Sequence, residues 1–123
     1  MPQPADSQFI PYRNLLGQIL TTRRTLLRRP QKEVASGAGM HPATLSRIES
    51  GETPATVEQL GLIAKQLNTY PGSILQEVDN LVIQLQNMGH QVLYSPAGPP
   101  GLKPMEAAAL GGLLALIFTS GRR

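Results

Sequence analysis

The chain contains no cysteine and no tryptophan, and its 123 residues include only three tyrosines and two phenylalanines. Without cysteine there is no disulfide, no thiol nucleophile and no cysteine-ligated zinc site. With so few aromatic rings, a hydrophobic core has to be built from aliphatic side chains, which suits a small helical bundle. A chain of this length predicts one domain, with room for an appendage.

Motifs of common enzyme classes are also missing from the sequence. There is no glycine-rich phosphate loop and no His-Glu-x-x-His signature, and the two histidines, His41 and His90, are far apart in the chain. We therefore expect no catalytic residue, no metal site and no cofactor. The polar stretch Met1–Ser7 has no basic run followed by an apolar one, so no secretory signal is visible and we expect a cytoplasmic protein.

Positive charge is concentrated in the first part of the chain. The net charge is +3, but residues 1–70 hold eight Lys or Arg against five acids, while residues 71–123 hold three of each. The pairs Arg23–Arg24 and Arg28–Arg29 supply half of the basic residues in the first part. Such pairs occur on ordinary solvated helix faces, and they also fit a polyanionic partner such as DNA.

Residues 31–51 predict two short helices joined by a glycine turn. The first would run from Gln31 to about Ala38, and Gly39 would form the turn because glycine adopts a positive φ at little cost. The second would run over 42–50, with a proline in its first turn and Gly51 at its end. A helix is expected before this unit from about residue 11, and another after it, where Thr56 and Gln59 fit a capping box.

The whole pattern resembles the helix-turn-helix of phage repressor and Cro-type DNA-binding regulators. The resemblance covers about Leu16 to Leu75, and the matching residues are Gln31, Ala35, Gly39, Leu45, Ser46, Ile48, Glu49, Gly51, Pro54, Leu60, Ala64 and Leu67. It implies an all-α fold in which five helices form a compact bundle. It also implies that helix 42–50 enters the major groove of DNA.

The resemblance assigns candidate roles to the side chains around this helix. Candidates for base contact are His41, Pro42, Ala43 and Arg47, of which Arg47 is the strongest because a guanidinium matches guanine O6 and N7. Candidates for phosphate contact are Arg28, Gln31, Lys32, Thr44, Ser46 and Thr53. Each has a plainer alternative: Arg47 as a phosphate clamp, Gln31 as a simple helix-start residue. The family also implies an ion pair between Arg24 and Glu49 that orients the reading helix.

Three positions depart from the family pattern. Pro30 replaces the usual polar cap, Arg29 stands where an apolar residue is common, and His41 replaces Ser or Thr. Since Pro42 and Ala43 make few hydrogen bonds, base specificity would depend on Arg47 and on DNA shape.

Beyond residue 72 the sequence predicts a helix over 73–88 with a short heptad seam. Its members are Ile74, Val78, Leu81, Leu85 and Met88, spaced four, three, four and three apart. We interpret the seam as a dimerisation surface. The alternative is an ordinary amphipathic helix that packs on its own domain.

The remaining segments form a C-terminal extension. Residues 90–94 predict a short strand that a second copy of the chain could pair with, and residues 95–104, with four prolines and two glycines, predict a stiff linker. Residues 105–123 predict an apolar helix that is too short for a typical membrane span and contains Glu106. We expect this helix to bury itself against protein, either its own chain, a second copy or another partner, and membrane association is the less favoured alternative.

These elements predict five regions: a disordered tail (1–8), a DNA-binding domain (9–72), a dimerisation segment (73–94), a linker (95–104) and an apolar partner-binding helix (105–123). The leading hypothesis is a dimeric repressor that binds a palindromic site on double-stranded DNA. The alternative is a protein-interaction adaptor with a DNA-binding module, such as an antitoxin or a tethered regulator, that uses residues 105–123.

Overall fold

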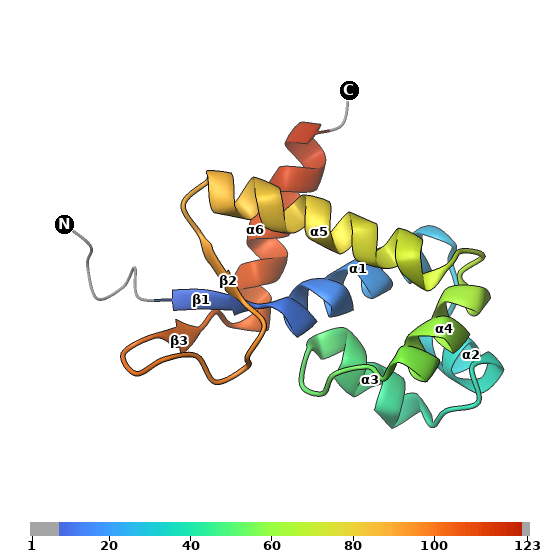
Figure 1. The fold of residues 1–123 in the computed structure, drawn as a ribbon. Helices are drawn as coiled ribbons and strands as arrows, with labels where there is room; N and C mark the ends of the chain where they lie inside the picture. The colour runs from blue at the N-terminus through green and yellow to red at the C-terminus, as the bar shows by residue number, and fades with distance from the viewer. Residues whose placement is uncertain (1–7, 122–123) are drawn as a thin grey trace.

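The computed structural model describes residues 8–121, of which the last two are described by their backbone alone. The elements follow the order β1 (Gln8–Pro11), α1 (Tyr12–Leu26), α2 (Gln31–Gly37), α3 (Pro42–Ser50), α4 (Val57–Gln66), α5 (Pro71–Asn87), β2 (Gln91–Leu93), β3 (Lys103–Pro104) and α6 (Ala107–Gly121). Figure 1 shows α1 at the centre, with α2, α3 and α4 gathered around one end and the strands at the other.

One aliphatic core joins the helices. Strand β1 and all six helices contribute buried side chains to this core. Phe9 is the one aromatic side chain among the buried residues of the described part of the chain. On α1 the buried residues fall at three- and four-residue steps, which places them on one helical face: Leu15, Leu16, Ile19 and Leu20. The predicted capping box of α4 is confirmed, since the Gln59 amide donates to Thr56 Oγ1 over 3.0 Å and the Thr56 amide donates to Gln59 Oε1 over 2.9 Å.

The description of the fold as all-α is wrong because three short strands form a parallel sheet. Strand β1 lies in the middle, pairing with β2 through Ile10 and Val92 and with β3 through Phe9 and Pro104. A second copy could have paired with the strand predicted over 90–94, but β2 pairs with β1 of the same chain. Gln8, predicted to belong to a disordered tail, is the first residue of β1, whereas residues 1–7 of that predicted tail lie outside the described part of the chain.

Residues 95–104 return the chain from β2 to β3 rather than acting as a free linker. Gly98, with a φ of 68°, lies against the ring of Phe9, where a Cβ would come within 2.5 Å of the ring. The Met105 amide then donates to the Phe9 carbonyl over 2.7 Å. The buried ring and this hydrogen bond tie the C-terminal extension to the start of α1.

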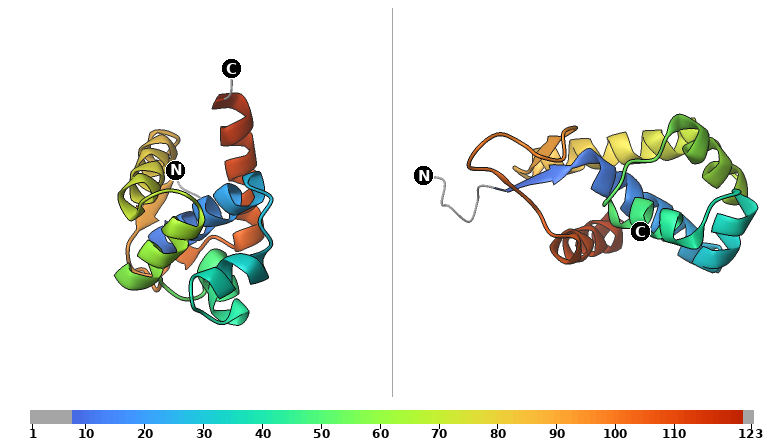
Figure 2. Two further views of the ribbon diagram at one scale, coloured as in Figure 1. Left: turned by 90° about the vertical axis from the view of Figure 1, so that its right-hand side faces the viewer. Right: turned by 90° about the horizontal axis from the view of Figure 1, so that it is seen from below.

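The described residues form six helices, one more than the five of the predicted bundle. Helix α6 adds to the bundle because Leu110 and Leu114 are buried in the common core. It rises steeply beside α1 and α5, and its C-terminal end extends beyond the other helices in Figure 1 and in the left view of Figure 2. No helix within residues 8–121 is both long and apolar enough to cross a membrane.

Candidate nucleic-acid interface

Helices α2 and α3 form a helix-turn-helix around a tight turn. Gly39 has a φ of 70°, and the Met40 amide donates to the Ala35 carbonyl over 2.9 Å, which closes the end of α2. The two helices are held together by buried aliphatic side chains, Val34 and Ala35 from α2 and Leu45 and Ile48 from α3. The sequence predicted this turn at Gly39 because few other residues accept its conformation.

The outward face of α3 is a continuous exposed strip. Ala43, Ser46, Arg47 and Ser50 are exposed and recur at three- and four-residue steps, so they share one face. His41 and Pro42 are exposed at the start of the helix, and Thr44 is half-buried at its edge. Among the described residues, no hydrogen bond or ion pair occupies the Arg47 guanidinium, which leaves its donors available to a ligand.

The end of α3 is fixed by a Schellman motif. Gly51 has a φ of 80°, the Gly51 amide donates to the Ile48 carbonyl, and the Glu52 amide donates to the Arg47 carbonyl over 2.9 Å. Gly51 also lies against Asn14 of α1, where an added Cβ would overlap the Asn14 side chain. A side chain at position 51 would therefore be strained by the backbone conformation and would force Asn14 to move.

A buried ion pair orients α3. Arg24 of α1 donates from Nε to Glu49 Oε2 over 2.7 Å and from Nη2 to Glu49 Oε1 over 3.0 Å. Gln31 of α2 donates from Nε2 to the same Oε1 over 2.8 Å. Three helices thus meet at one carboxylate, and Glu49 is 7% exposed. Such bidentate pairing fixes geometry more surely than it adds stability.

The predicted phosphate-contact residues occupy three places around α3. Gln31 and Lys32 begin α2, Arg28 lies in the loop before it with a φ of 55°, and Thr53 follows α3. Gln31 is half-buried and uses one amide hydrogen on Glu49, so only its second hydrogen and its carbonyl oxygen remain for DNA.

A family model described as Helix-turn-helix matches residues 20–74. These residues belong to the helix-turn-helix family of DNA-binding regulators. The match spans the end of α1, the whole α2–turn–α3 unit, α4 and the start of α5. No curated protein matches the sequence.

Solved structures of low sequence identity share the fold. The clp gene regulator ClgR of Corynebacterium glutamicum is similar in two crystal structures. One is 24% identical with a TM-score of 0.54 and covers 57% of this chain and 91% of that chain; the other is 20% identical with a TM-score of 0.57 and covers 91% and 96%. A point mutant of the restriction-modification controller protein C.Esp1396I is 16% identical with a TM-score of 0.56 and covers 59% and 95%.

Two features that hold the helix-turn-helix together escaped the sequence analysis. Gly17 lies where α1 crosses α3, and a Cβ there would come within 2.2 Å of the Glu49 carbonyl oxygen. A glycine inside an apolar helical pattern is the signal that could have revealed such a close crossing. Arg29, noted only as a departure from the pattern, donates to the main-chain and side-chain oxygens of Gln66, whose Nε2 donates to the Gly37 carbonyl.

The dimer interpretation of the seam on α5 needs correction. Ile74, Val78, Leu81 and Leu85 are at most 3% exposed within a single chain, because α5 packs this face on α1 and α4. The fifth member, Met88, is 54% exposed at the end of the helix. The alternative of an ordinary amphipathic helix describes α5, and these four side chains are not available to a second copy.

Proposed function

We propose that the protein is a sequence-specific regulator of transcription that acts as a dimeric repressor on a palindromic DNA site. The observation that carries this proposal is the exposed strip of α3. The helix that bears this strip is held in position by Arg24, Glu49 and Gln31. The helix-turn-helix family supports DNA binding, and the proteins of similar fold include regulators by name.

In this proposal α3 lies in the major groove with its first turn toward the bases. Arg47 reads a guanine through two of its three guanidinium nitrogens, and Ala43 offers its methyl group to a thymine methyl. His41 and Pro42 lie beside these contacts at the start of the helix. Arg28, Gln31, Lys32, Thr44, Ser46 and Thr53 contact phosphates, which position the helix and make binding salt-dependent.

Two copies are proposed because one helix-turn-helix makes few base contacts. Dimers of such modules bind half-sites about one helical turn apart, so a two-fold protein reads a two-fold site. Repression follows if the occupied site overlaps a promoter.

The proposal is tested by selecting binding sites from random duplex DNA with the purified chain. We expect enrichment of a two-fold sequence whose half-sites are about 10 base pairs apart, centre to centre. Arg47→Ala should weaken binding by about 1–3 kcal/mol and relax the preference at one base pair of each half-site.

Lys32→Ala is the matched control, since it also removes one exposed positive charge. It should weaken binding to all sequences equally and lower the salt dependence by about one counterion. If Arg47→Ala also weakens all sequences equally, Arg47 does not read a base; if no sequence is enriched, the proposed specificity is wrong.

A further inference from the structure

Helix α2 carries predicted phosphate contacts but has little apolar surface to hold it in place. It is seven residues long, and its buried side chains are Val34 and Ala35. A helix of this length is not stable alone in water, so contacts with other elements must fix its position. Lys32 is exposed in its first turn, and it can meet a phosphate only when the whole helix is correctly placed.

Two polar contacts fix the first turn of α2. Gln31 donates from its side-chain amide to Glu49 of α3 over 2.8 Å. Glu33 accepts from Nε of Arg29 over 3.3 Å, and the Arg29 carbonyl accepts from Arg24 over 2.9 Å. Arg29 is therefore joined, through its main chain, to the same Arg24 that pairs with Glu49.

A polar bridge between Arg29 and Gln66 fixes the other end of α2. Helix α4 ends at Gln66 and α2 ends at Gly37, and the last carbonyls of a helix have no partner within it. Arg29 donates from Nη1 to the Gln66 carbonyl and from Nη2 to Gln66 Oε1 over 3.2 Å. Gln66 Nε2 donates to the Gly37 carbonyl over 3.1 Å. The Arg29–Gln66 bridge thus caps two helices and ties α2 to α4, which Leu60 and Ile63 anchor in the core.

The surroundings of the Arg29–Gln66 bridge are shaped to hold it. Gly37 leaves room for the Gln66 amide, because a Cβ at position 37 would overlap that side chain. Each of the three guanidinium nitrogens of Arg29 donates a hydrogen bond within the chain, to Glu33 or to Gln66. Arg29 is therefore engaged with the protein, whereas the exposed Lys32 faces solvent.

We propose that Arg29 and Gln66 are positioning residues for DNA binding, which hold Lys32 against a phosphate without contacting DNA themselves. This inference rests on the proposed function, in which Lys32 meets a phosphate. When the bridge is lost, the Lys32 contact should weaken because α2 is no longer tied to α4. Helix α3 should keep its orientation, because the side chains of Arg24 and Glu49 pair independently of the bridge.

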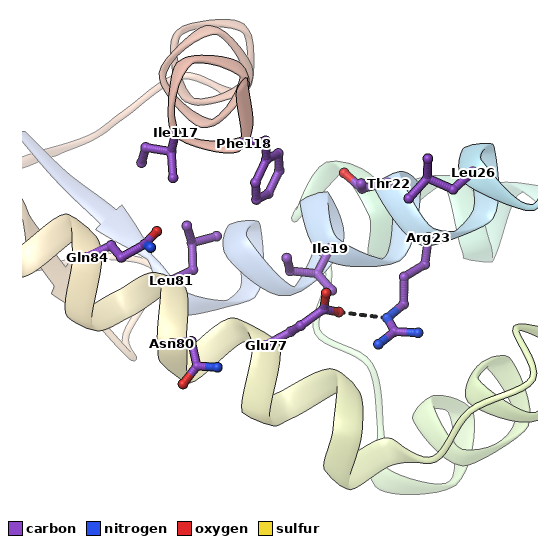
Figure 3. A pocket seen from close by; sticks show the side chains of 10 residues that line it. All are labelled: Ile19, Thr22, Arg23, Leu26, Glu77, Asn80, Leu81, Gln84, Ile117 and Phe118. Carbon is purple, nitrogen blue, oxygen red and sulfur yellow. Dashed lines mark hydrogen bonds and ion pairs between the residues drawn. The ribbon is translucent and has the colours of Figure 1, made fainter. Parts of the chain in front are cut away.

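Arg23 provides a matched control on another side of α1. Its side chain is 29% exposed, against 28% for Arg29, and it pairs with Glu77 of α5 over 2.6 Å. Figure 3 shows this pair beside a groove of about 380 Å³ that is lined by α1, α5 and α6. Replacing Arg23 therefore removes one positive charge and one ion pair and leaves the Arg29–Gln66 bridge intact.

A double-mutant cycle with the full chain and a random-sequence DNA duplex, repeated at several salt concentrations, tests the proposal. Lys32→Ala should weaken binding about three- to tenfold in the wild type but less than about twofold in Gln66→Met. Gln66→Met should also lower the salt dependence by about one counterion, although it removes no charge. Arg29→Leu should suppress the effect of Lys32→Ala in the same way, whereas Arg23→Leu should leave that effect at its full size.

Gly37→Ala keeps the test decisive if Gln66→Met does not fold. It displaces the Gln66 amide from the end of α2 and gives that helix a better helix former. It should therefore leave thermal unfolding of the chain nearly unchanged and still suppress the effect of Lys32→Ala on DNA binding. A bridge that serves folding alone would change the unfolding temperature and leave the effect of Lys32→Ala at its full size.

Three results would overturn the assignment. These are a Lys32→Ala variant that binds like the wild type, full-sized effects of Lys32→Ala in the bridge variants, and an equal suppression by Arg23→Leu. The random-sequence duplex separates this inference from the proposed function. A chain that binds this duplex but enriches no sequence contradicts the proposed specificity alone, whereas a chain that binds no duplex DNA contradicts both.

Discussion

Helices α5 and α6 are both apolar on the side that faces the core, but they differ on the side that faces solvent. The exposed positions of α5 include Gln76, Glu77, Asp79 and Asn80. The two carboxylates among them contact α1: Glu77 pairs with Arg23, and Asp79 accepts a hydrogen bond from the Tyr12 hydroxyl over 2.6 Å. Over the described residues of α6, no side chain makes a hydrogen bond or an ion pair. A helix with a polar outer face can remain exposed to water, whereas an exposed apolar helix face is typical of an interaction surface.

The largest effects are expected where the two helices are alike. Leu85→Ala on α5 and Leu114→Ala on α6 each remove a side chain that is at most 1% exposed. Each should lower the free energy of unfolding by about 2–5 kcal/mol, measured by urea denaturation. Leu116→Ala is the control and should change it by less than about 0.5 kcal/mol in the monomer. If Leu114→Ala is as mild as Leu116→Ala, α6 is not part of the core.

The next largest effect concerns the polar attachment of α5. Tyr12→Phe keeps the ring, whose centroid lies 4.9 Å from that of Tyr94, but removes the hydroxyl that donates to Asp79. We expect the free energy of unfolding at neutral pH to fall by about 1–2 kcal/mol, since the acceptor is a carboxylate. An unchanged value at neutral pH would mean that this hydrogen bond does not hold α5 against α1.

The same contact predicts a loss of stability in alkali. Burial, followed by the hydrogen bond to Asp79, raises the pKa of the Tyr12 hydroxyl well above its ordinary value of about 10. The unfolded chain releases this proton at a lower pH than the folded chain, so the contribution is complete below about pH 10 and declines as the pH rises further. The free energies of unfolding of the wild type and Tyr12→Phe, measured by urea denaturation, should converge in that range. A difference that stays constant with pH would contradict a stabilising role for the Tyr12 hydroxyl.

A smaller effect of opposite sign is expected on the outer face of α6. Gly112→Ala fills open space and removes a glycine from a helix interior. It should raise the free energy of unfolding of the monomer by about 0.5–1 kcal/mol, measured by thermal or urea denaturation at low protein concentration. A loss of stability would show that the chain itself packs closely against this position.

The smallest effect is expected from the ion pair on the flank of α5. Arg23 and Glu77 are 29% and 47% exposed, so solvent screens their attraction. Glu77→Gln should lower the free energy of unfolding by about 0.2–1 kcal/mol, with a difference that shrinks at high salt. A larger loss that salt does not alter would assign Glu77 a packing role instead.

The sequence predicted the local elements of the DNA-binding part well, for reasons that are themselves local. Gly39 and Gly51 mark positions of positive φ, and Thr56 with Gln59 marks a helix start, so each element carries its own signal. The exposed strip of α3 followed from the spacing of Leu45 and Ile48. The base and phosphate contacts assigned to this strip remain predictions.

What the sequence could not predict depends on contacts between distant segments. The pairing of Ile10 with Val92 leaves no local pattern, because a parallel pair of very short strands carries almost no periodicity. The heptad spacing of α5 was misread for a related reason: spacing shows that a helix has an apolar face, but not whether its own chain or a second copy covers it.

The central place of β1 has a consequence for the order in which the chain folds. Its partners, Gln91–Leu93 and Lys103–Pro104, are made more than 80 residues later, so the sheet cannot form during synthesis until most of the chain has emerged. The contacts within α2, α3 and α4 are short-range and can form early. Newly made chains should therefore contain a structured DNA-binding segment before β1 pairs with β2 and β3. A chain that stops before residue 103 would leave one edge of β1 unpaired and open to association with other unfinished chains.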